Sequence, residues 1–149
     1  MWVDAVVMYF YSMLGPLFPA FNTEVMLLYQ LMTGTQHPVV MAVTASAGQA
    51  TLYLVLYALG EGTLMRWKAL GRRLAALTPA QRERFRQGTS AALASGALTG
   101  LPPVILMAPL VSSFGYSRLR LVVIVFTGRV VRFGLLLAFS DQVRRWFGI

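Results

Sequence analysis

The chain has 149 residues, of which 57% are hydrophobic and only 12% are charged, and its formal net charge is +8. This composition indicates a single membrane domain over residues 1–149, because soluble domains average about 25% charged residues. Cysteine is absent and there is one histidine, which excludes disulfides, thiolate chemistry and multi-histidine or cysteine metal sites. We therefore expect an all-α integral membrane protein with no cofactor and no metal.

The first apolar region predicts two short helices. Trp2–Leu14 and Val25–Met32 are each shorter than the about 20 residues that a helix needs to cross a bilayer. The segment between them contains proline, asparagine, threonine and glutamate, and irregular polar backbone is tolerated at membrane depth only within protein or a watery cavity. We predict a re-entrant hairpin. The alternative is one tilted helix from Trp2 to Ala20 followed by an interfacial segment.

A full crossing is predicted at Val39–Leu59, after a glycine-proline turn. Small residues in the centre of this helix allow another helix to approach closely. Gln49 lies among them, and an amide at this depth needs a hydrogen-bond partner. His37 in the preceding turn is interpreted as an interfacial loop residue, with a proton-relay role as the alternative.

The polar connection 61–87 carries most of the positive charge. This pattern is typical of a cytoplasmic loop beside a membrane. The chain fits poorly with the features of nucleic-acid-binding proteins, so we exclude nucleic-acid binding. Thr78, Pro79 and Gln81 form a helix-start signature, so a helix should begin there and run through Arg86. The basic residues of the connection are Arg66, Lys68, Arg72, Arg73, Arg82, Arg84 and Arg86.

The second half repeats the order of the first. Ala91–Val111 is interrupted at residues 99–103, which predicts a second hairpin, and Leu119–Ser140 is long enough for a second crossing, followed by a short tail. Half-repeats of about 1–60 and 88–147 would then have opposite orientations. This is the inverted-repeat plan of secondary transporters.

Three ionisable residues lie within otherwise apolar stretches: Glu24, Arg129 and Arg132. The two arginines are three residues apart and share a helix face, and facing lipid would be very costly for them. They are expected to face a cavity, the Glu24 carboxylate or an anionic ligand, and guanidinium groups suit phosphate oxygens. Glu24 could also exchange a proton and couple transport to a proton gradient. The alternative is a purely structural Glu–Arg pair.

Four motifs in this order resemble the DedA family, also called the VTT or SNARE-associated Golgi domain. They are Phe18-Pro19-Ala20-Phe21-Asn22-Thr23-Glu24; Gly48-Gln49 with Tyr57 and Gly60; Gly88 followed by Leu101-Pro102; and Gly128-Arg129-Val130-Val131-Arg132-Phe133. The chain departs from the family at three places. Apolar residues follow Pro103 where many members are charged, Gln49 replaces a frequent acidic residue, and Glu61 replaces a basic one.

The resemblance implies a polytopic membrane protein that moves or scrambles lipids. Bacterial members are linked to the return of undecaprenyl phosphate to the cytoplasmic leaflet and to the proton motive force, and eukaryotic relatives scramble phospholipids. The expected location is the bacterial inner membrane, with multiple passes. A homo-oligomer is compatible with this expectation.

Together these observations predict a flippase for a phosphate-bearing lipid, with possible proton coupling. The alternatives are a small-ion or metabolite carrier on the same scaffold, or a non-transporting structural subunit. An enzyme is not expected, because no nucleophile–base set, metal cluster or nucleotide loop is found. The expected substrate-binding or coupling residues are Glu24, Arg129, Arg132, Asn22 and Gln49. The expected packing residues are Pro19, Gly48, Tyr57, Gly60, Pro102, Pro103 and Gly128.

Overall fold

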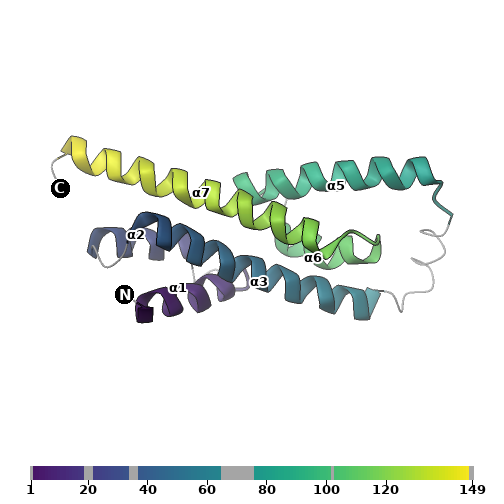
Figure 1. The fold of residues 1–149 in the computed structure, drawn as a ribbon, viewed down its shortest axis with the longest axis horizontal. Helices are drawn as coiled ribbons and strands as arrows, with labels where there is room; N and C mark the ends of the chain where they lie inside the picture. The colour runs from purple at the N-terminus through teal and green to yellow at the C-terminus, as the bar shows by residue number, and fades with distance from the viewer. Residues whose placement is uncertain (1, 19–21, 34–36, 65–75, 102, 148–149) are drawn as a thin grey trace. The chain divides into compact units, whose positions relative to one another are not determined.

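The computed structural model describes residues 2–18, 22–33, 37–64, 76–101 and 103–147, and within these ranges the chain is helical without strands. The all-α prediction is therefore confirmed for the described residues. In chain order the helices are α1 (Trp2–Leu14), α2 (Thr23–Thr33), α3 (Pro38–Leu64), α5 (Pro79–Thr99), α6 (Val104–Ser113) and α7 (Arg118–Phe147) (Figure 1).

Two of the described helices are long and apolar enough to cross a membrane. The apolar stretch of α3 covers Pro38–Glu61, 24 residues, and that of α7 covers Arg118–Ser140, 23 residues. Both exceed the about 20 residues required for a crossing. They contain the two predicted crossings, and α7 continues as a helix to Phe147, within the stretch that was expected to form a tail.

The first apolar region is divided as predicted into two short helices. α1 has 13 residues and α2 has 11 residues, and α1 ends at Leu14 instead of continuing toward Ala20. Residues 15–17 form a turn in which the Leu17 amide donates to the Leu14 carbonyl oxygen, 3.0 Å. α1 therefore ends before the stretch that a single tilted helix from Trp2 to Ala20 would require.

Side chains just before the helices satisfy the free amides at their N-termini. Before α2, Asn22 Oδ1 accepts from the Glu24 amide at 2.9 Å, which is the usual geometry of an N-cap. Before α5, the predicted capping box is confirmed: Thr78 Oγ1 accepts from the Gln81 amide, and Gln81 Oε1 accepts from the Thr78 amide. Exposed His37 caps α3 in a similar way, because its Nδ1 accepts from the Val39 amide at 3.3 Å.

The helix that starts at Pro79 runs through Arg86 as predicted and continues without a break into the second apolar region. It is one helix, α5, of 21 residues. Gly88 lies inside it, and a helical glycine costs only about 1 kcal/mol relative to alanine, which is too little to end a helix whose next turns are packed. The helix ends instead at Gly100, whose φ of 90° is left-handed and favours glycine.

The chain divides into two compact units, each of which takes half of α3 and half of α7. The first unit is Met1–Thr51 with Phe126–Ile149, and the second is Leu52–Val125. The units therefore cut across the predicted half-repeats. Each unit combines two helices that are consecutive in the sequence with parts of the two long helices. These consecutive helices are α1 and α2 in the first unit and α5 and α6 in the second.

The core of the first unit joins four helices. Its buried residues come from α1, α2, the first half of α3 and the second half of α7: Met8, Leu27, Met41, Ala42, Ala45, Phe133 and Leu137. Gly48 makes the closest approach, because a Cβ atom built there would lie 2.2 Å from the Tyr9 carbonyl oxygen. The Tyr9 hydroxyl also bonds to Thr51 Oγ1 at 2.7 Å, so α1 is fixed against α3 at two adjacent points.

The core of the second unit is likewise built from four helices. Its buried residues come from the second half of α3, from α5, α6 and the start of α7: Tyr53, Tyr57, Leu93, Val104, Ala108, Val111, Tyr116, Leu121 and Val125. At Gly60 a Cβ atom would lie 2.4 Å from the Pro109 carbonyl oxygen. The predicted packing glycines Gly48 and Gly60 therefore each lie where a helix backbone approaches α3.

Candidate functional site

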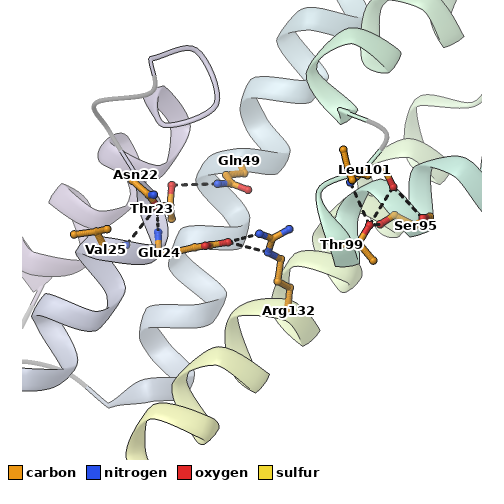
Figure 2. Close-up of polar contacts among 9 residues, drawn as sticks. All are labelled: Asn22, Thr23, Glu24, Val25, Gln49, Ser95, Thr99, Leu101 and Arg132. Atoms are coloured by element: carbon orange, nitrogen blue, oxygen red, sulfur yellow. Dashed lines mark hydrogen bonds and ion pairs between the residues drawn. The ribbon is translucent and has the colours of Figure 1, made fainter.

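Glu24 and Arg132 form an ion pair between α2 and α7 in the first unit (Figure 2). Arg132 Nε donates to Glu24 Oε1 at 2.9 Å, and Arg132 Nη2 donates to the same oxygen. The side chains are partly buried, with 24% of Arg132 and 35% of Glu24 exposed. Because both bonds go to one carboxylate oxygen, this pair is not the bidentate arrangement in which each oxygen receives its own donor.

The start of α2 positions the carboxylate. Glu24 is the second residue of the helix, where the helix dipole favours a negative charge. Asn22 is exposed, and its side chain caps the N-terminus of α2. Thr23, between them, is buried at 5% exposure. Asn22, predicted to bind substrate, is thus seen here in a capping role.

Gln49 joins this group from α3. Its Nε2 donates to Thr23 Oγ1 at 3.1 Å, which is the partner that a buried amide was expected to need (Figure 2). Its Oε1 is buried and, within the described residues, accepts no hydrogen bond. One end of the amide therefore holds α2 against α3, and the other end is an unused acceptor.

Arg129 precedes Arg132 by about one turn of α7 and is buried at 9% exposure. Arg132 Nη1 is also buried, and among the described residues it has no hydrogen-bond partner. The predicted set of Glu24, Gln49 and Arg132 is therefore brought together in one unit, with Arg129 on the same helix. The arrangement contains a buried cationic donor that the carboxylate does not use.

Two further polar side chains are buried in this unit. Gln30 lies seven residues after Thr23 on α2, which places both on one helix face, and Ser12 lies on α1. Gln30 Oε1 and Ser12 Oγ are buried without a hydrogen-bond partner in the described part of the chain. Thr23, Gln30 and Ser12 were not among the predicted substrate-binding residues, although the helical spacing of Thr23 and Gln30 is a signal that could have found these two.

A polar network crosses the second unit at Tyr57, a residue predicted only for packing. The buried Tyr57 hydroxyl donates to the Tyr116 carbonyl oxygen, and the Tyr116 hydroxyl bonds to Ser90 Oγ at 2.6 Å. Arg118 lies over the Tyr57 ring, 5.7 Å from its centroid, and pairs with Glu61. The network ties α3, α5 and the start of α7 together.

The turn after α5 is closed by hydroxyl groups of the second unit (Figure 2). Ser95 Oγ donates to the Leu101 carbonyl oxygen at 3.0 Å, and Thr99 Oγ1 accepts from the Leu101 amide at 3.1 Å. Pro103 follows as the residue before α6 and is exposed. These bonds satisfy backbone groups at the interruption that the sequence predicted.

The remaining predicted positions can be located in part. Gly128 is buried on α7. Pro19, Pro102 and the basic residues Arg66, Lys68, Arg72 and Arg73 lie outside the described residues. Across the described ranges, no group of three or more histidine, aspartate or glutamate side chains could hold a metal ion. Comparisons with protein-family models, curated proteins and solved structures find no match for this chain.

Proposed function

We propose that this chain is a multi-pass membrane transporter that moves a phosphate-bearing lipid between leaflets. The observation that carries the proposal is the group around the Glu24–Arg132 pair. Glu24 pairs with Arg132 on α7, Arg129 lies three residues earlier on the same helix, and one buried guanidinium nitrogen of Arg132 has no hydrogen-bond partner among the described residues. Such residues in a membrane span mark a substrate site by default, because they are costly to bury.

Charge supports an anionic substrate. Arg132 keeps its positive charge, because an arginine cannot lose its proton in a protein. The donors of a guanidinium group match the oxygens of a phosphate. A phosphate group reaching Arg132 Nη1 would satisfy this donor. A proton on Glu24 would release Arg132 during the transport cycle.

The proposed topology is an inverted repeat with two re-entrant hairpins in the bacterial inner membrane. Helices α1, α2 and α6 have 13, 11 and 10 residues, each too short to cross a bilayer alone. The matching composition of the two units supports the repeat, since each combines one hairpin with half of α3 and half of α7. The resemblance of the four sequence motifs to the DedA family supports the same assignment.

The experiment is an assay of leaflet-to-leaflet movement of a polyprenyl phosphate in proteoliposomes. We expect movement by the wild type and its loss in both Arg132→Gln and Glu24→Gln, because each substitution removes one side of the site. Glu83→Gln is the matched control, since Glu83 is a carboxylate on α5 whose side chain is 45% exposed. It should leave the rate unchanged.

The same assay separates transport from a purely structural pair. If the ion pair only fixes packing, Glu24→Gln will lower stability, and the folded wild-type protein will move no lipid. Folding of each variant is checked by circular dichroism before reconstitution. Absence of movement by the folded, inserted wild type contradicts the proposal.

A further inference from the structure

We propose that the second unit carries a surface that gathers anionic lipid headgroups from the membrane around the protein. We call it the basic aromatic surface, and it consists of Arg84, Phe85, Phe114, Leu119 and Arg120. The proposal rests on the membrane location given above but not on transport. The occupant is the anionic headgroup of a bilayer lipid such as phosphatidylglycerol.

Packing brings the parts of this surface together from distant places in the sequence. The Phe85 ring on α5 stacks on Phe114 after α6, with ring centroids 4.2 Å apart. Further along α5, Ser90 Oγ bonds to the Tyr116 hydroxyl at 2.6 Å. Within this unit, the first turns of α5 and of α7 consequently lie at the same end (Figure 1).

The surface combines exposed apolar groups with exposed charge. Phe85 is 42% exposed, Phe114 36% and Leu119 72%, although the two rings stack on each other. Arg84, which precedes Phe85 in the sequence, and Arg120, which follows Leu119, are also exposed. Aromatic rings with basic neighbours are typical of the interface between lipid tails and headgroups.

The described residues of the second unit carry more positive than negative charge. The described residues of the second unit contain five arginines and two glutamates, which leaves a charge of +3. Both glutamates already pair with an arginine, Glu83 with Arg86 and Glu61 with Arg118. Both carboxylates therefore pair with arginines outside the basic aromatic surface. An anionic headgroup is the complementary partner of Arg84 and Arg120.

A tryptophan placed in the surface can report which lipids surround it. The three native tryptophans are replaced by phenylalanine and Phe85→Trp is introduced in the full chain. The protein is reconstituted in phosphatidylcholine vesicles with a minor fraction of phosphatidylglycerol. One or the other lipid is brominated near the glycerol end of an acyl chain, and quenching of the tryptophan by each is compared.

We expect phosphatidylglycerol to be enriched at Phe85→Trp about fivefold over its share of the bilayer, the effect expected of one basic residue at a membrane surface. A tryptophan at Val123, which is 52% exposed within the α7 span, should report the bulk ratio. The enrichment of phosphatidylglycerol at Phe85→Trp should fall to the bulk ratio in Arg84→Gln/Arg120→Gln. It should also fall to the bulk ratio in about 1 M salt, where the screening length is about 3 Å. Arg84→Lys/Arg120→Lys should retain it, because charge alone is required.

Quenching by phosphatidylglycerol at Phe85→Trp in proportion only to its share of the bilayer overturns the proposal, as does quenching by neither lipid. Enrichment that persists in the double glutamine variant overturns the role of Arg84 and Arg120. Arg132→Gln distinguishes this surface from the proposed transport site. It should abolish lipid movement and leave the enrichment at Phe85→Trp unchanged.

Discussion

Replacing Gly48 by alanine tests how closely α1 and α3 pack in the first unit. A Cβ atom at this position would lie 2.2 Å from the Tyr9 carbonyl oxygen and 3.2 Å from the Met13 amide nitrogen, both backbone atoms of α1. Real Cβ contacts below 3.0 Å essentially do not occur, so α1 has to move by about 0.8 Å. A backbone cannot rotate away as a flexible side chain can.

The expected cost follows from three contributions. Overpacking of this kind costs about 1–3 kcal/mol, and stretching the 2.7 Å Tyr9–Thr51 hydrogen bond adds about 1 kcal/mol. Removing a glycine from a helix returns about 1 kcal/mol. We therefore expect Gly48→Ala to lower the free energy of unfolding by about 1–3 kcal/mol.

The assay is unfolding in mixed detergent–dodecyl sulfate micelles, followed by circular dichroism. Gly134→Ala is the matched control, because Gly134 is also in a long apolar helix and nothing lies within 4 Å of a Cβ atom built there. It should be neutral or stabilising by up to about 1 kcal/mol. Equal stability of the two variants would refute the close approach of α1 to α3.

Two further substitutions test local structure with the same unfolding assay. Tyr57→Phe removes the donor to the Tyr116 carbonyl oxygen and should lower the free energy of unfolding by about 1–3 kcal/mol. Tyr29→Phe, at an exposed position, should lower it little. Similar values for the two variants would contradict the hydrogen-bond network around Tyr57. Thr78→Ala removes the side-chain acceptor of the capping box and should lower the free energy of unfolding by about 1 kcal/mol. Thr78→Ser should restore most of this loss. An unchanged free energy of unfolding in Thr78→Ala would show that the cap does not stabilise α5.

The sequence predicted those features that depend on local chemistry. Length and apolar composition located the two long helices, and the Thr78-Pro79 signature located the start of α5. The cost of buried charge predicted that Arg132 would face a cavity, an anionic ligand or Glu24, and in the structure it pairs with Glu24, although 108 positions separate them. The need of a buried amide for a partner predicted that Gln49 would be bonded.

The features that were missed depend on tertiary contacts. Nothing near Gly88 in the sequence shows that α5 would continue, because its next turns are held by packing around Leu93 and by the Ser90–Tyr116 bond. The partner of Gly60 is the backbone of Pro109, and a backbone contact leaves no residue-type signal. Gln49 was expected to have a partner, but its identity as Thr23 follows only from the fold.

The central claim is that the group around Arg132 holds a lipid phosphate, and lipid retention measures this most directly. The purified protein in mild detergent is titrated with a polyprenyl phosphate or with the corresponding polyprenol, and bound lipid is counted by native mass spectrometry. We expect the wild type to prefer the phosphate by about 10- to 150-fold, as a charge-assisted hydrogen bond of about 1.5–3 kcal/mol would give, and Arg132→Gln to lose this preference. Equal retention of phosphate and alcohol by the wild type, or an undiminished preference in folded Arg132→Gln, would contradict it.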